Sequence, residues 1–112
     1  MSDVEVAQLE NQKQGMEHTI RMRDAAERLQ KTADWKLVIG QGFCLHEAAR
    51  YAQESGDPAL SATNRADSLA LAQASGHLLR FLNAVRNIGN KAEYDMADLE
   101  NELVKARNGE ED

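Results

Sequence analysis

The sequence has few of the residues that would stiffen or interrupt it. It contains one cysteine, Cys44, so a disulfide within the chain is excluded. One proline, Pro58, leaves long stretches free to be helical, and aromatic residues make up only 4% of the 112 residues. Hydrophobic residues reach 42% and charged residues 29%, mostly good helix formers. This composition predicts a folded, all-α protein with a thin core.

Long apolar runs are also missing. Apolar residues stand together for only a few positions, as in Leu-Val-Ile at 37–39, whereas a membrane-spanning helix needs about 20. The N-terminus, Met-Ser-Asp-Val-Glu, lacks the basic and apolar regions of a signal peptide. We therefore expect no membrane partner and no secretory leader.

The residues that cap or interrupt helices divide the chain into four expected helices. Asp34 is the expected N-cap of the second helix, and two glycines in the segment 40–42 are expected to end it. The segment 55–58 is the strongest break, and a hydroxyl or amide side chain at 61–64 starts the last helix. We predict one helical domain over residues 1–107, with helices at about 3–31, 34–41, 43–54 and 61–107, and a disordered acidic tail over 108–112.

The last helix is the dominant feature, whether it is one helix or two joined end to end. At about 1.5 Å per residue it would be roughly 70 Å long, whereas a compact domain of this size has a radius of gyration near 13 Å. Gly76 and Gly89 lie on its apolar stripe and suggest close helix approach, although a kink at Gly89 is the alternative. The stripe advances in steps of three or four, as a coiled coil requires: Leu69, Ala72, Gly76, Leu79, Leu82, Val85, Gly89, Ala92, Met96, Leu99, Leu103.

We expect the ends of the two long helices to extend past a small core. They could pair antiparallel as a coiled-coil-like arm or cross to a neighbouring subunit. The core itself should form from the two short helices and the middles of the long ones, with Trp35 as its anchor and Cys44 buried. The residues predicted to join copies in a homo-oligomer are apolar positions on the extending ends: Leu9, Met16, Met96, Leu99 and Leu103.

No motif predicts catalysis, a metal or a cofactor. The segment 46–50, His-Glu-Ala-Ala-Arg, lacks the second histidine of a zinc-protease helix, and a surface pair between Glu47 and Arg50 is the better interpretation. Cys44 and His46 are two positions apart and do not face each other on a helix. With no convergent acid, base or nucleophile, we predict that the protein is not an enzyme.

Charge is unevenly distributed. The net charge is −6, and residues 93–112 alone carry eight acids and two bases. This end is interpreted as a solvated tail, with mimicry of nucleic acid or docking on a basic partner as the alternatives. Arginines on the long helices are possible contacts for an anion or partner, although solvated faces and ion pairs are favoured because no aromatic residues are interleaved with them: Arg21, Arg23, Arg80 and Arg86.

The middle of the chain, about residues 20–90, resembles short all-helical proteins of unassigned role from tailed bacteriophages. The resemblance rests on Arg-Asp-Ala-Ala-Glu-Arg-Leu at 23–29, Asp-Trp-Lys at 34–36, Gly-Phe at 42–43, Glu-Ala-Ala-Arg at 47–50 and Leu-Leu-Arg-Phe-Leu at 78–82. It implies a phage setting, in the virion or the host cytoplasm, and no catalytic residues.

The leading hypothesis is a non-enzymatic, oligomer-forming phage protein that acts in particle structure or assembly through helix–helix contacts. The first alternative is an accessory protein that binds and inhibits a host or defence factor. The second is a nucleotide- or nucleic-acid-binding module that uses the arginines. Other phage or host proteins remain open as partners, and nucleic acid is disfavoured.

Overall fold

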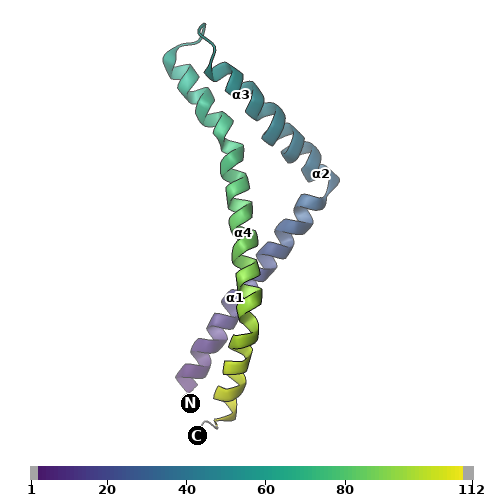
Figure 1. Ribbon diagram of the computed structural model, residues 1–112, viewed down its shortest axis with the longest axis vertical. Coiled ribbons are helices and arrows are strands. Elements are labelled where there is room, and N and C mark those ends of the chain that lie inside the picture. The colour runs from purple at the N-terminus through teal and green to yellow at the C-terminus, as the bar shows by residue number, and fades with distance from the viewer. Residues whose placement is uncertain (1–2, 110–112) are drawn as a thin grey trace. The chain divides into compact units, whose positions relative to one another are not determined.

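The computed structural model describes residues 3–109, and over that range the chain is helical with no strand (Figure 1). The all-α class is therefore confirmed. No helix in the described range combines the length and apolar character needed to cross a membrane. The elements are α1 (Asp3–Lys31), α2 (Ala33–Trp35), the π-helix η1 (Lys36–Glu47), α3 (Ala48–Ser55) and α4 (Ala62–Asn108).

The chain divides into two compact units, where the sequence predicted one domain. Unit 1 comprises residues 1–26 and 84–112, and unit 2 comprises residues 27–83. Asn108 still belongs to α4, and Gly109 follows in a turn with φ of 65°. The rest of the predicted disordered tail, residues 110–112, lies outside the described residues.

Unit 1 is an antiparallel pair of helices. Arg107 of α4 bonds Glu10 near the start of α1 at 2.8 Å, whereas Glu93 of α4 bonds Arg23 further along α1 at 2.8 Å. As residue numbers increase along α1, the numbers of the residues that they contact on α4 decrease, so the two helices run antiparallel. The predicted pairing of the C-terminal helix with the N-terminal helix is confirmed.

The seam of this pair follows a heptad pattern on both helices. The covered positions are spaced three and four apart, as in a coiled coil. On α1 they are Val6, Leu9, Lys13, Met16, Ile20 and Arg23; on α4 they are Val85, Gly89, Ala92, Met96, Leu99, Leu103 and Ala106. Leu103 is 1% exposed and Leu99 4%. Since a coiled-coil seam drifts only slowly, this spacing keeps the same faces together along the whole unit.

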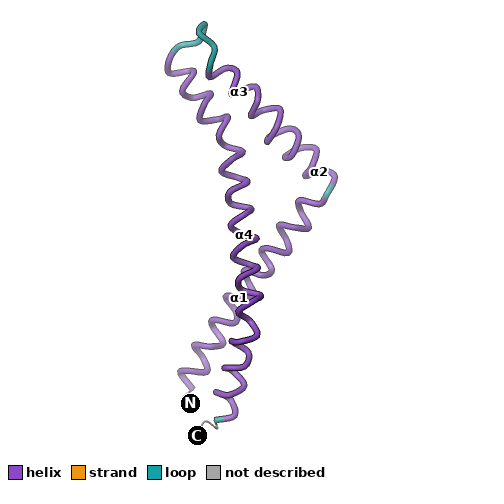
Figure 2. The backbone as a smooth tube through the Cα atoms, viewed as in Figure 1, coloured by secondary structure: helices purple, strands orange, loops and turns teal. Residues whose placement is uncertain are grey.

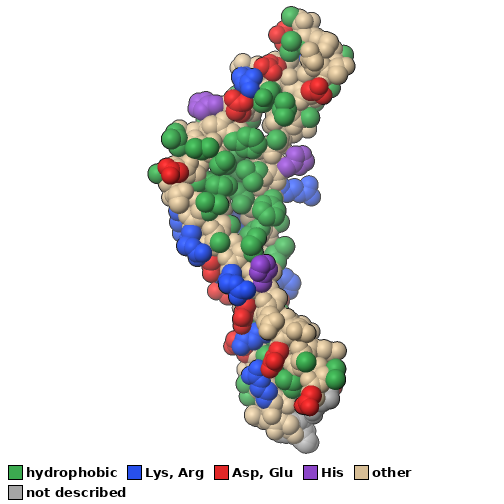
Figure 3. Space-filling view, turned by 180° about the vertical axis from the view of Figure 1, so that it is seen from behind, with side chains coloured by type: hydrophobic (Ala, Val, Ile, Leu, Met, Phe, Trp, Pro, Cys, Tyr) green, Lys and Arg blue, Asp and Glu red, His purple; other side chains and the backbone are tan. Residues whose placement is uncertain are grey.

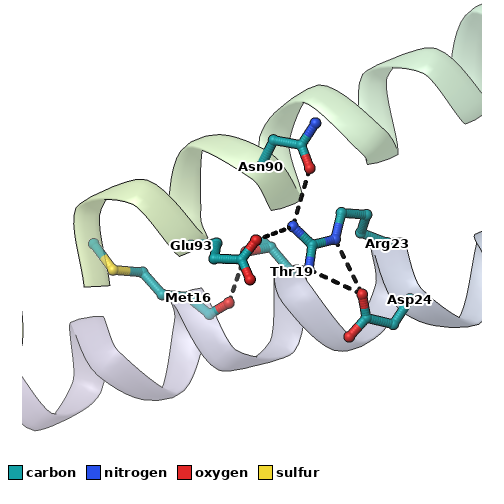
Figure 4. A network of polar contacts seen from close by, with 6 residues as sticks. All are labelled: Met16, Thr19, Arg23, Asp24, Asn90 and Glu93. Carbon is teal, nitrogen blue, oxygen red and sulfur yellow. Dashed lines mark hydrogen bonds and ion pairs between the residues drawn. The ribbon is translucent and has the colours of Figure 1, made fainter. Parts of the chain in front are cut away.

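At Arg23, a network of polar side chains joins the two helices of the seam (Figure 4). The buried guanidinium of Arg23 donates to Asp24 at 2.9 and 3.0 Å, to Asn90 at 3.0 Å and to Glu93 at 2.8 Å. The hydrogen bonds to Glu93 and Asp24 raise the pKa of Arg23, so it stays charged. A buried charge needs such partners, because it has lost its water.

Gly89 makes this crossing possible. A Cβ atom at that position would lie 2.5 Å from Cβ of Arg23, closer than two carbon atoms can approach. The predicted close approach at Gly89 is confirmed, and α4 runs through it without a break. The same prediction for Gly76 is wrong, since nothing lies within 4 Å of a Cβ placed there.

Within unit 2 the chain turns a corner at Thr32, between α1 and α2. Its backbone is extended, and its side-chain oxygen accepts a hydrogen bond from the Trp35 amide at 3.1 Å. Thr32, not the predicted Asp34, is therefore the N-cap. From Ala33 the chain stays helical to Ser55, so the predicted break at 40–42 is wrong. The two glycines lie inside η1, and the backbone continues through them as a π-helix.

A loop over residues 56–61 joins the two arms of unit 2, Ala33–Ser55 and the first part of α4. Ser61 accepts a hydrogen bond from the Asn64 amide at 3.1 Å and so caps α4, in agreement with one of the predicted start residues. Figure 2 shows the arms joined at this loop and spreading apart away from it.

The predicted core in the middle of the chain is not present. In the described part of the chain, the four buried hydrophobic residues all belong to unit 1, whereas the buried residues among 27–83 are Ser68 and Ser75. Trp35 and Cys44, predicted to be buried, are only half-buried. Trp35 lies in α2, at the end of its arm away from the 56–61 loop, where the two arms have spread apart (Figure 2).

The Gly89 crossing leads to a test with paired alanine substitutions. Alanine in a helix interior gains about 1 kcal/mol over glycine, but overpacking costs about 1–3 kcal/mol. Gly15→Ala has open space in the same unit and should raise the free energy of unfolding. Gly89→Ala should lower it, because α1 has to move. Urea unfolding followed by circular dichroism measures both, and equal gains for the two variants would contradict the close packing.

Candidate interaction site

Unit 2 exposes more large apolar side chains than unit 1 does. Among residues 3–109, nine of the fourteen exposed large hydrophobic residues fall in residues 27–83. They are Leu29, Leu37, Val38, Phe43, Leu45, Leu69, Leu71, Leu79 and Phe81, and we call them the uncovered apolar set. Figure 3 shows hydrophobic side chains gathered on one face of the upper half, where the helices of unit 2 lie in Figure 1.

The side chains between the arms of unit 2 explain this exposure. The covered face of α4 in this unit presents Arg65, Ser68, Ala72 and Ser75, at steps of three and four. Ser68 donates to Glu54 of the other arm at 3.2 Å. Serine and alanine occupy positions that leucine fills in a stable helical hairpin, while the leucines lie on the flanks. A chain seldom exposes contiguous apolar surface of this kind unless something covers it.

The two units also differ in charge. Residues 27–83 hold six acids and six bases, so unit 2 has no net charge. Unit 1 holds thirteen acids and seven bases and carries the whole −6 of the chain. Unit 2 is therefore the electrically neutral part of the chain, and unit 1 is the acidic part.

The four arginines predicted to contact an anion lie in different surroundings. Arg23 is buried in its network with Glu93, Asn90 and Asp24. Arg21 and Arg86 are exposed in unit 1, and Arg80 is exposed in unit 2. The structure thus places the most enclosed of the four in a structural role.

The segment 46–50 forms a surface ion-pair cluster, as the sequence predicted. Arg50 bonds Glu47 at 2.7 Å and Glu54 at 3.1 Å, and its guanidinium lies 4.2 Å from the ring centre of Tyr51. The hydrogen bond from Arg50 lowers the pKa of Glu47. Within residues 3–109, no group of three or more histidine, cysteine or acidic side chains is arranged to hold a metal ion.

The five residues predicted to join copies all lie on the seam inside unit 1. Leu99 and Leu103 are buried within the single chain, and Leu9, Met16 and Met96 are half-buried. Their role between copies stays a prediction. The seam already occupies these side chains, whereas the uncovered apolar set is exposed in the single chain.

Sequence reasoning missed the uncovered apolar set. Leu69 and Leu79 were assigned to the apolar stripe of α4, but periodicity does not say which part of a stripe finds a partner within the chain. The available signal was the run of small residues beside them, Ala70, Ala72 and Ala74, together with Ser75.

Comparison with known proteins adds no relative: no family model, no curated protein and no solved structure matches this chain.

Proposed function

We propose that this protein is a non-enzymatic assembly component that associates with further copies of itself through unit 2. The observation that carries the proposal is the uncovered apolar set in a unit whose buried residues are two serines. Unit 2 gains little by folding alone, so its apolar side chains favour a second copy over water.

The charge of unit 2 supports a second copy as the occupant. The arm Ala33–Ser55 carries three acids and two bases, and the α4 segment 62–83 carries one acid and two bases. The arms thus have net charges of −1 and +1, and the arm of one copy suits the opposite arm of another.

The setting of the proposal comes from the resemblance to short helical phage proteins. We place the protein in the virion or the host cytoplasm of a tailed bacteriophage, as a structural or assembly component. Mass spectrometry of purified particles tests this setting: stoichiometric amounts indicate a virion component, and its absence from particles indicates action before or outside packaging.

The sequence alternative, an accessory factor that binds a host protein, draws on a separate observation. Unit 1 carries the entire net charge, which favours a basic partner. Truncating residues 93–112 would be a poor test, because it would remove the buried Leu99 and Leu103 and unfold the helix pair. Substitutions of surface charges are the cleaner probe.

Self-association should be visible by sedimentation equilibrium, with an average mass that rises above the 12.4 kDa of one chain as concentration increases. Leu79→Glu and Phe81→Glu should each weaken it about tenfold, because burying a charge opposes the contact. Both side chains are half exposed, so folding does not depend on them. Val104→Glu, equally exposed on the same helix but in unit 1, is the control and should change nothing. A constant 12.4 kDa up to about 1 mM would refute the proposal.

Salt should strengthen the association. Because unit 1 carries −6, copies repel through it, and the Debye length falls from about 30 Å at 0.01 M salt to about 8 Å at 0.15 M. The dissociation constant should therefore fall as salt rises over this range, with circular dichroism confirming that the helix content is unchanged. A rise in the dissociation constant would indicate that ion pairs, not apolar contacts, join the copies.

A further inference from the structure

Unit 1 has a shallow apolar groove along one edge of its helix pair. Two adjoining hollows share Thr19 and Ile88 and so form one continuous groove. Ile88 is 56% exposed, and Met22 is also exposed. Gly15 widens the groove, because nothing lies within 4 Å of the place where its Cβ would stand. The lining is Gln12, Gly15, Met16, His18, Thr19, Met22, Val85, Ile88, Lys91, Ala92 and Asp95.

The opposite edge of the same helix pair is closed by ion pairs. Glu10 pairs with Arg107 at 2.8 Å, Lys13 with Glu100 at 3.9 Å, and Arg23 with Glu93 at 2.8 Å. On α4 these partners are seven residues apart, as positions on one edge of a coiled coil are. The groove edge has no such pair in its lining; Gln12, Thr19, Ile88 and Asp95 occupy it instead, also in steps of seven. Ion pairs between the helices thus cover one edge of the pair, whereas the groove edge has no ion pair between the helices in its lining.

The groove leads toward a stretch of acids. Asp95 lines it, and Asp98 and Glu102 follow on the same face of α4 at steps of three and four. Residues 95–106 contain four acids and one base, Lys105. Lys91 bonds Asp95 at 2.7 Å and neutralises that carboxylate, and the bond raises the pKa of Lys91, so Asp98 and Glu102 are the acids that attract a basic partner.

We infer that this groove binds an amphipathic helix of a partner protein whose apolar face is followed by basic residues. The apolar anchors lie against Met16, Met22 and Ile88, since methionine side chains adapt to varied shapes. The basic residues lie over Asp98 and Glu102. Charge decides against a second copy here, because a copy of unit 1 brings a further −6 to an acidic edge. The site is separate from self-association through unit 2.

The test uses a synthetic amphipathic helix with leucine on one face and lysine on the other, labelled for fluorescence anisotropy. Its matched control replaces every lysine with glutamate. The lysine peptide should bind the full-length protein, and the glutamate peptide at least about tenfold more weakly. Equal binding of the two peptides would overturn the inference, because it would show apolar adhesion without charge recognition. Absence of binding by the lysine peptide would also overturn it.

Variants locate the binding. Ile88→Gln and Met22→Gln should each weaken the lysine peptide about fivefold to tenfold. Tyr94→Gln, on the same helix but 83% exposed and outside the groove, should leave its affinity unchanged. The double change Asp98→Asn and Glu102→Gln should weaken binding at low salt, whereas Glu27→Gln with Asp34→Asn in unit 2 should not.

Two further measurements keep this inference distinct from self-association. Chemical-shift changes in the wild-type protein should map to the groove lining, and changes confined to residues 27–83 would overturn the inference. Ile88→Gln should leave the sedimentation mass unchanged, and Leu79→Glu should leave the affinity for the peptide unchanged. If Ile88→Gln instead dissociates copies, a second copy occupies the groove and the inference fails.

Discussion

The close crossing of α1 and α4 at Arg23 and Gly89 is the constraint on which the rest of unit 1 depends. A missing Cβ lets the helices approach, and the guanidinium that fills the crossing is held by Asn90 and Glu93. An arginine in a seam position is costly unless all its donors find partners, so only one alignment of the helices suits it. From this point the heptad spacing carries the alignment to Leu103, and the apolar seam supplies the burial that the polar crossing lacks.

The same helix, α4, behaves differently in unit 2. There its covered face carries Ser68 and Ser75, which leave little apolar area between the arms, and leucines lie on its flanks. Hydrophobic burial is roughly proportional to apolar area removed from water, so the second unit gains little of it within one chain. The small side chains between the arms and the exposure of the uncovered apolar set therefore have the same cause, since the leucines lie on the flanks of α4 and not on its covered face. Under the proposed self-association, a second copy would supply the core that this unit lacks.

The sequence predicted the features that depend on local spacing. The long helix, the Glu47–Arg50 pair and the close approach at Gly89 all follow from period and residue size. Prediction from the sequence failed where the structure depends on which residues of another helix lie opposite a given position. Gly76 has the same place on the stripe as Gly89 but no neighbour, and the glycines at 40–42 lie within a π-helix that no local rule requires. The groove of unit 1 was also missed, because it arises only when two faces distant in sequence come together.

The separation of apolar surface from charge limits what assemblies the protein can form. Every copy added through the neutral unit 2 also adds the −6 of unit 1, so repulsion grows with each addition while the apolar gain per contact stays constant. Such a balance favours a small closed oligomer over an open filament. It also leaves each copy with an acidic helix pair whose one edge is closed by Glu10–Arg107 and its companion ion pairs and whose other edge is apolar. The proposed self-association and the proposed partner binding therefore use different side chains, so one would not have to be released for the other to occur.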